Sequence, residues 1–261
     1  MQKGDVNVII VNEFEISNIP VIEMVEKDAT NKKLPLAFFL HGFTNQKEHG
    51  LMPGYEMARQ GMRVIIPDAF LHGERKDESF SESKERAFWE IEWKTVHELP
   101  DIVDYYISKG LAAKNDVSVT GLSMGGIAVC MAMVKYPWIR SAACLMGNPN
   151  PLHFTNWLLT SKWQTDREEL QVISPEAIDE MMKDFIPLTL QAFPEKIAGR
   201  PFYIWHGKAD DTVPFSHMQH FANEVVGKDY ARQVHVDFYE GYGHKVPLEV
   251  FKKMALFLAS Q

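Results

Sequence analysis

Apolar and polar residues are arranged in two different patterns along this chain, and each pattern predicts one kind of secondary structure. Three short runs have the apolar character expected for strands buried on both faces of a sheet. They are "LPLAFFLHG" (34–42), "MRVIIPDAF" (62–70) and "DVSVTGLSMGG" (116–126). Three further strand-like runs follow: "AACLMGNP" (142–149), "RPFYIWHG" (200–207) and "QVHVDFYEG" (233–241). Two earlier runs, "VNVIIVN" (6–12) and "IPVIEMVEKD" (19–28), predict an opening antiparallel pair. The sequence therefore predicts about eight strands.

Segments with a helical period lie between these runs, with apolar positions that recur every three to four residues. They are residues 50–60, 86–109, 124–136, 215–226 and 246–259. Pro100 is expected to kink or end the second of them. Strands that alternate with helices predict an α/β fold, in which helices flank a mostly parallel sheet.

The segment 148–199 interrupts this alternation, because it is far longer than an ordinary connection between a helix and a strand. It has a helical pattern of its own in "SPEAIDEMMKDF" (174–185). We therefore expect a single domain over 1–261 with a small helical insertion at 148–199 that acts as a lid. Phe154, Trp157 and Trp163 in the insertion are candidates for a substrate pocket. Packing of the same rings onto the sheet explains them equally well.

The charge balance narrows the class of partner. The chain has 35 acidic and 27 basic residues and a formal net charge of -8. Such a protein repels phosphate backbones and anionic lipid, so we expect neither nucleic acid nor a membrane surface as a partner. The start "MQKGDVNVII" lacks the apolar segment of a signal peptide, and no run has the length of a membrane span, so a cytoplasmic location is expected.

The two cysteines, Cys130 and Cys144, lie in apolar runs, which is typical of buried, reduced thiols. They give no disulfide framework and no thiolate metal site. We therefore expect a site that needs neither a metal nor another cofactor.

The candidate nucleophile is Ser123 in "GLSMG" (121–125), a G-x-S-x-G sequence between a predicted strand and a predicted helix. The serine of this motif lies on a sharp strand-to-helix turn whose strained backbone needs small neighbours. The amides that begin the helix favour negative charge developing beside the serine. A glycine-rich turn that merely connects the two elements is the alternative explanation.

Acyl transfer at such a serine needs backbone N–H groups for the oxyanion. We expect one from Met124, the residue after the serine, and one from Phe43 in the loop "HGFT" (41–44) after the third strand. His41 in this loop is expected to orient it by hydrogen bonds rather than to act as a base.

The candidate base is His244, in the glycine-rich loop "GYGH" (241–244) before the last predicted helix. The acid is expected after the preceding strand, where "WHGKADDTVP" (205–214) has two adjacent carboxylates, Asp210 and Asp211. Spacing alone does not choose between them. His217 and His220 share a helical face but lack a third metal ligand of suitable spacing, so we expect surface or packing roles for them.

The motifs "LHGF", "PDAFLHGER", "GLSMGG", "WHGKADDTVP" and "GYGH" occur together in an order that resembles the α/β-hydrolases. More narrowly, the chain resembles bacterial carboxylesterases of the prolyl-oligopeptidase and dienelactone-hydrolase branch, from about residue 36 to the C-terminus. The acid-loop pattern of that family is H-G-x-x-D-x-x-V-P, which implies that Asp210 is the acid. A serine nucleophile departs from the cysteine of dienelactone hydrolases, and the chain lacks room for the propeller of prolyl oligopeptidases.

The expected function is therefore a serine carboxylesterase that cleaves small-to-medium acyl esters through Ser123, His244 and Asp210. The same triad also suits a thioesterase or a small-peptide hydrolase. A ligand-binding protein without activity is a further alternative, because fold alone does not fix function. The expected partner is a small ester substrate, and a homo-oligomer is compatible with the sequence.

Overall fold

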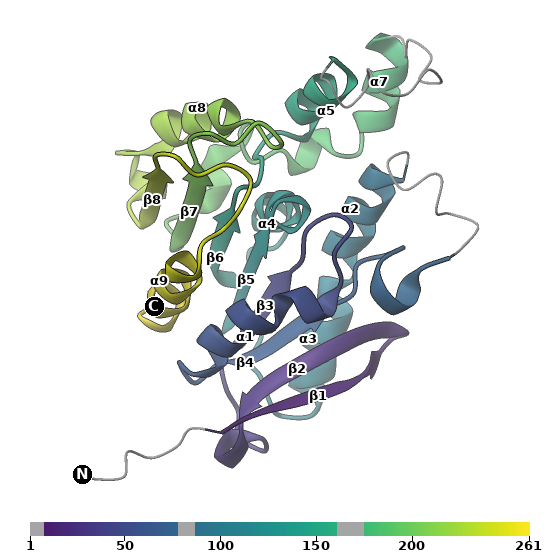
Figure 1. Cartoon of the computed structure of the whole chain (residues 1–261), viewed down its shortest axis with the longest axis vertical. Coiled ribbons are helices and arrows are strands. Elements are labelled where there is room, and N and C mark those ends of the chain that lie inside the picture. The colour runs from purple at the N-terminus through teal and green to yellow at the C-terminus, as the bar shows by residue number, and fades with distance from the viewer. Residues whose placement is uncertain (1–7, 78–86, 161–174) are drawn as a thin grey trace.

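The computed structural model describes residues 8–77, 87–160 and 175–261, whose strands form one eight-stranded sheet (Figure 1). The strands are β1 (Ile9–Ile16), β2 (Ile19–Glu26), β3 (Leu36–Leu40), β4 (Arg63–Pro67), β5 (Val117–Leu122), β6 (Ile139–Leu145), β7 (Phe202–Gly207) and β8 (Val234–Tyr239). Their spatial order is β1-β2-β4-β3-β5-β6-β7-β8. β2 is antiparallel to both of its neighbours, and all other pairs from β4 to β8 are parallel. The predicted mostly parallel sheet is confirmed.

The opening pair is a hairpin, as its pattern predicts. Ile16 lies opposite Ile19, so only Ser17 and Asn18 form the turn. Both residues have positive φ angles, 51° and 63°. Two positive angles are typical of the tight turn whose twist matches that of the flanking strands.

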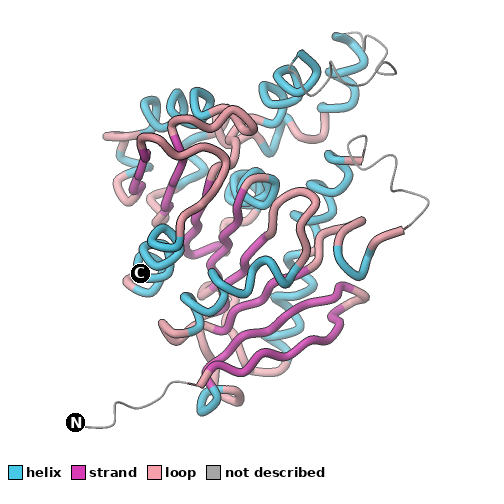
Figure 2. Tube along the Cα trace, in the orientation of Figure 1, coloured by secondary structure: helices cyan, strands magenta, loops and turns pink. Residues whose placement is uncertain are grey.

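Helices connect the parallel strands on both faces of the sheet (Figure 2). They are α1 (Leu51–Ala58), α2 (Phe88–His97), α3 (Leu99–Ser108), α4 (Met124–Lys135), α5 (Pro151–Thr160), α7 (Pro175–Met182), α8 (Phe215–Val225) and α9 (Leu248–Ala259). The break expected near Pro100 is real: Pro100 lies in the first turn of α3, where the missing N–H of proline costs no helical hydrogen bond.

Two apolar cores lie on opposite faces of the sheet. The larger one joins the sheet to α2, α3, α4 and α8, and the smaller one joins it to α1 and α9. Successive side chains of one strand point alternately into the two cores. In β6, Ala142 and Cys144 face the larger core, and Ala143 and Leu145 face the smaller one. This two-sided burial explains why the inner strands β3 to β7 are largely apolar, whereas the edge strand β8 is only partly buried and carries His235 and Asp237.

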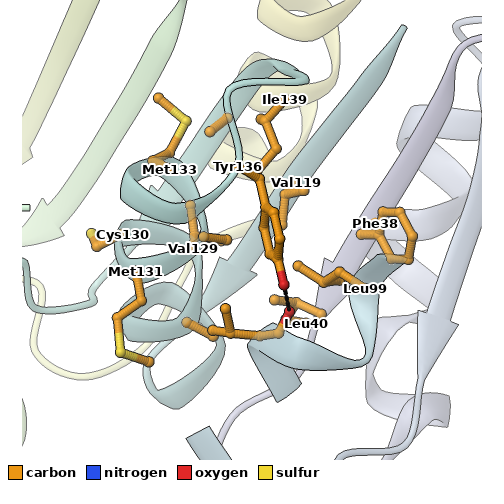
Figure 3. Packing of buried hydrophobic residues seen from close by; sticks show 14 of the residues in the cluster. Phe38, Leu40, Leu99, Val119, Val129, Cys130, Met131, Met133, Tyr136 and Ile139 are labelled. Carbon is orange, nitrogen blue, oxygen red and sulfur yellow. Dashed lines mark hydrogen bonds between the residues drawn. The ribbon is translucent and has the colours of Figure 1, made fainter. Parts of the chain in front are cut away.

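Helix α4 runs through the larger core, and its side chains from Met124 to Met133 are all buried. Figure 3 shows the neighbouring Tyr136 ring among Leu99, Val119 and Ile139. The Tyr136 hydroxyl donates a hydrogen bond to the carbonyl of Val96 at 3.1 Å. The polar end of a buried ring is thus satisfied by the α2 backbone. The helix that follows Ser123 is therefore held rigidly.

The segment 148–199 contains α5, α7 and two short 3₁₀ turns, Ile186–Leu188 and Pro194–Ile197. Figure 1 shows α5 and α7 together at one end of the molecule. Trp163, a predicted pocket residue, lies outside the described residues. Within the three described ranges, no helix has both the length and the apolar character of a membrane span.

Candidate active site

Ser123 occupies a strained turn between β5 and α4. Its φ and ψ angles are 55° and -118°, which an L-residue rarely adopts. A Cβ on Gly121 would lie 2.5 Å from the carbonyl oxygen of Gly125, and one on Gly125 would lie 2.1 Å from that of Leu40. Neither approach is possible for a larger residue, so both glycines of the motif are required by packing.

A chain of hydrogen bonds joins three residues that are far apart in the sequence. The Ser123 Oγ lies 2.9 Å from Nε2 of His244. The Nδ1 atom of the same ring lies 2.8 Å from Oδ2 of Asp210. Because Nδ1 faces a carboxylate, it carries the ring proton, and Nε2 is left to accept the proton of the serine.

The Asp210 carboxylate is buried, and all of its acceptor sites are filled. Its Oδ1 accepts the backbone N–H groups of Thr212 at 2.9 Å and Val213 at 3.1 Å. Its Oδ2 faces Nδ1 of His244 and Nε2 of His206, the latter at 3.1 Å. Burial alone raises the pKa of Asp210, but the bonds from His206 and His244 outweigh it and hold the pKa below its usual range.

The two adjacent aspartates are in different environments. The side chain of Asp210 is fully buried against the two histidines, whereas Asp211 is exposed. The tie that spacing leaves open is therefore resolved geometrically, because it is Asp210 whose carboxylate contacts His244.

The loops that carry the acid and the base are tied to each other. The backbone N–H of Ala209 donates to the carbonyl of Tyr242 at 2.9 Å, and that of Lys208 donates to Tyr239 at 2.9 Å. These bonds hold the end of β7 against the loop that carries His244. The separation of Asp210 and His244 is thus fixed by the backbone as well as by their own contact.

The two predicted oxyanion donors are available for a ligand. Met124 begins α4, and its N–H has no acceptor among the described residues; the same holds for the N–H of Phe43. Met124 is buried and Phe43 is half-buried. An unpaired N–H at the first position of a helix is a favourable site for negative charge.

Two histidines fasten the loop that carries Phe43. His41 Nε2 accepts the N–H of Ala69 at 3.0 Å, and His72 Nε2 accepts the N–H of Thr44 at 3.1 Å. Thr44 itself has a φ of 66°, a strained conformation that this bond helps to hold. Burial lowers the pKa of His41 to about 4, so its ring is a neutral acceptor. The structure places His41 as a loop-orienting residue, as the sequence predicts.

A row of aromatic rings runs from the oxyanion loop to α5. Phe43 meets Phe88 edge to face at a centroid distance of 5.6 Å, and Phe88 lies 6.1 Å from Phe154. Phe154 in turn stacks on Trp157 at 5.7 Å. Phe154 is 4% exposed, so it packs within this row, while Trp157 is half-buried. The predicted pocket residues on α5 therefore approach the site through Phe88.

Phe88 has no sequence signal of its own, because it is the first residue of an ordinary amphipathic helix, α2. His206 is the histidine of the H-G-x-x-D-x-x-V-P pattern, which was used above only to choose the aspartate. Nδ1 of His217 accepts a hydrogen bond from the side-chain amide Nδ2 of Asn148 at 2.8 Å, and His220 pairs with Glu224 at 3.1 Å. Among the described residues, no group of three or more His, Cys, Asp and Glu side chains is arranged to hold a metal ion.

Comparison with known proteins gives consistent matches. A model of the prolyl oligopeptidase family matches residues 57–259. The "Putative esterase YitV" of Bacillus subtilis (strain 168) is 31% identical over 238 residues, which are 89% of this chain and 91% of that protein. "Esterase YjfP" of Escherichia coli (strain K12) is 27% identical over 210 residues, which are 77% of this chain and 78% of that protein.

Solved structures share the fold at low sequence identity. TT1662 from Thermus thermophilus is 18% identical with a TM-score of 0.74, and the match covers 97% of this chain and 98% of that one. Est1E from Butyrivibrio proteoclasticus with bound ferulic acid is 18% identical with a TM-score of 0.67, over 96% of this chain and 100% of that one. At this identity the likeness shows the fold alone.

Proposed function

The chain belongs to the prolyl oligopeptidase family, and we propose that it is a serine carboxylesterase whose triad is Ser123, His244 and Asp210. The observation that supports this most directly is the pair of hydrogen bonds from the serine through the imidazole to the carboxylate. Each partner is within the distance at which a proton can pass between nucleophile and base. The acid is held by backbone amides, so the triad is preorganised.

In the first half of the reaction, His244 Nε2 takes the proton of Ser123 while Oγ forms a bond to the ester carbonyl carbon. The carbonyl oxygen becomes an oxyanion, which accepts the N–H groups of Phe43 and Met124. Asp210 stabilises the imidazolium that forms. His244 then gives its proton to the alcohol oxygen as the carbon–oxygen bond breaks, which leaves Ser123 acylated.

In the second half, a water molecule takes the place of the alcohol. His244 removes a proton from the water as its oxygen attacks the acyl carbon, and the oxyanion forms again in the same site. Collapse of this intermediate breaks the bond to Ser123 and returns the proton from His244 to Oγ. The acid product leaves, and the groups are in their starting state.

An ester is the favoured substrate class among those that this triad can cleave. Both curated relatives carry the word esterase in their names. The aromatic row of Phe43, Phe88, Phe154 and Trp157 offers apolar surface beside the oxyanion donors, which suits an acyl chain of small to medium size. The helical insertion over 148–199, which carries α5, is proposed to act as a lid over this surface.

The test is a panel of p-nitrophenyl esters of increasing acyl length, with acyl-thioester and aminoacyl substrates beside it. We expect the ester with a small to medium acyl group to have the highest kcat/KM. Ser123→Ala should lower kcat by about 10⁴-fold or more, because the nucleophile is lost. Ser108→Ala, at the exposed end of α3, is the matched control and should leave kcat unchanged.

A fluorophosphonate probe gives a second measurement that needs no substrate. It should label the native protein at Ser123 and leave the Ser123→Ala variant unlabelled. Native-like ester turnover by Ser123→Ala would refute the assigned nucleophile. Faster cleavage of thioesters or aminoacyl substrates than of every ester would replace the esterase by one of the other hydrolase classes.

A further inference from the structure

His206 contacts Asp210, the proposed triad acid, at the same carboxylate oxygen as His244. It is the next-to-last residue of β7 and its side chain is fully buried. Its Nε2 atom lies 2.9 Å from the carbonyl oxygen of Val213 and 3.1 Å from Oδ2 of Asp210. The edge of the ring packs against Phe215 of α8 at a centroid distance of 5.9 Å. The imidazole is thus held in one orientation, with Nε2 toward the acid.

The proton of the His206 ring is assigned by its neighbours. Both groups that face Nε2 are acceptors only, so Nε2 must carry the hydrogen. The Nδ1 atom is buried and has no hydrogen-bond partner among the described residues. A second proton on Nδ1 would place a buried N–H without an acceptor, which is costly. The His206 ring therefore donates from Nε2.

Two histidine nitrogens therefore lie beside one carboxylate oxygen, and the single Nε2–H of His206 faces both this oxygen and the carbonyl oxygen of Val213. His244 donates to Oδ2 at 2.8 Å, and His206 reaches the same oxygen at 3.1 Å. Oδ1 is already held by two backbone amides, so the carboxylate keeps its place if His206 is removed. His206 therefore affects how strongly Oδ2 attracts the Nδ1 proton of His244.

We propose that His206 is a positioning residue of the triad, which shares Oδ2 of Asp210 with His244 and so limits the stabilisation that this oxygen gives to the imidazolium. The inference rests on the proposed function, since it concerns the base of that reaction. Without His206, Oδ2 has one donor fewer and attracts the proton of His244 more strongly. His206 thereby keeps His244 unprotonated, and able to act as a base, over a wider range of pH.

Other titratable groups around this cluster do not account for the effect. His217 on α8 is bonded to Asn148, and its pKa is lowered to about 4, first by burial and then by the neighbouring His153 and His206. Asp211 lies in the same loop and is exposed. Lys208 in this loop and Glu240 beyond β8 pair with each other at the surface. Of these groups, only His206 contacts the Asp210 carboxylate together with His244.

The test compares two substitutions of one ring. His206→Phe keeps the planar side chain but has no donor, whereas His206→Gln has an amide N–H that can replace Nε2–H. His217→Phe, another buried histidine close by, is the matched control. For each protein, kcat/KM is measured as a function of pH, and the His244 ring is titrated by NMR, which does not require turnover.

In His206→Phe we expect the acid limb of kcat/KM and the NMR midpoint of His244 to move to higher pH by about 0.5–1 unit, because a hydrogen bond to a charged group is transmitted only in part. A shift of one unit lowers kcat/KM about tenfold on the acid limb. KM should not change. His206→Gln should restore the native limb, and His217→Phe should retain it.

An unchanged midpoint in His206→Phe, or one displaced to lower pH, overturns the proposal. So does a His206→Gln variant that behaves like His206→Phe, since a ring that merely fills space is not replaced by an amide donor. If the NMR midpoint moves as expected but the native protein cleaves no ester, the proposed esterase function is wrong. The inference that His206 and His244 share Oδ2 of Asp210 is then still supported. The two failures are therefore separate.

Discussion

Two buried carboxyl groups in this molecule have opposite surroundings. Asp210 lies in the loop between β7 and α8, and its oxygens face four donors. Glu92 lies on α2, which packs against α4, and it is 0% exposed. Neither oxygen of Glu92 has a hydrogen-bond partner among the described residues. One region of the interior thus surrounds a carboxylate with hydrogen-bond donors, whereas the other surrounds a carboxyl to which no described residue donates a hydrogen bond.

The comparison shows that burial and hydrogen-bond donors change the pKa of a carboxyl group in opposite directions. Burial raises the pKa of Glu92 well above its usual range, so this group is a neutral acid. Burial also raises the pKa of Asp210, but hydrogen bonds from His206 and His244 reverse the result. A buried carboxylate that orients an imidazole therefore needs several hydrogen-bond donors, because burial alone would favour its protonated, neutral form.

The largest expected effect comes from removing the charge of Asp210. Asp210→Asn should lower kcat by about 10³–10⁴-fold, because an amide neither fixes the tautomer of His244 nor stabilises its imidazolium. KM should change little, since the substrate does not contact this residue. Steady-state kinetics on the preferred p-nitrophenyl ester gives both numbers.

The adjacent aspartate is the control that the chain itself provides. Asp211→Asn makes the same chemical change at an exposed position one residue away. Its kcat should stay within about twofold of the native value, as is usual for surface substitutions. Equal losses in the two variants would mean that the loop, rather than the buried carboxylate, is what catalysis requires.

A smaller effect is expected at Glu92, on stability rather than on activity. Because its pKa is raised in the folded protein, the unfolded chain loses this proton first as pH rises above about 4.5. The free energy of unfolding should therefore fall by up to about 1.4 kcal/mol per pH unit from there until Glu92 ionises in the folded state. Glu92→Gln cannot ionise, so this dependence should be absent from it.

The measurement is denaturant unfolding of native protein, Glu92→Gln and Glu90→Gln at about pH 5 and about pH 8. Glu90 is on the same helix but is exposed and pairs with Lys94, so its substitution should leave the pH dependence unchanged. The gain of Glu92→Gln over native protein should be larger at the higher pH. A gain that is the same at both pH values would show that Glu92 does not titrate as its burial implies.

The alternation of apolar runs and helical periods was sufficient to predict the sheet, because strands buried on both faces leave an unambiguous pattern. The eight strands and the break at Pro100 follow from it. The places of Ser123, Asp210 and His244 after predicted strands also led to the proposed triad, and the structure brings these three side chains together. Choosing Asp210 over Asp211 needed the family pattern, because adjacent side chains on a loop have no periodic signal that tells which one turns inward.

Contacts between distant segments left no trace in the sequence. The bond between His72 and the N–H of Thr44 joins two loops that are 28 residues apart, and neither loop shows it in its composition. The same is true of Phe88 meeting Phe154. His206 is part of the H-G-x-x-D-x-x-V-P pattern, but the pattern does not show that its ring contacts Asp210. Lack of partners is equally invisible: the pattern around Glu92 is that of an ordinary amphipathic helix.

The smallest effect is expected at a third carboxylate, which has a partner but is not buried. Glu240 pairs with Lys208 at 2.6 Å, close in sequence to the loops of Asp210 and His244, and its side chain is 81% exposed. Water already stabilises both charges, so the pair gains little on folding. Lys208→Ala should therefore change the free energy of unfolding by less than about 1 kcal/mol and leave kcat within about twofold of the native value.

Denaturant unfolding of the native protein and of Lys208→Ala at low and high salt measures this change. Added salt should lower the unfolding free energy of the native protein by no more than the Lys208→Ala substitution does. A loss in Lys208→Ala as large as the fall in unfolding free energy that ionisation of Glu92 is expected to cause would mean that partners alone decide the behaviour of these carboxylates. The expected small loss means that partners matter only where burial has removed the water.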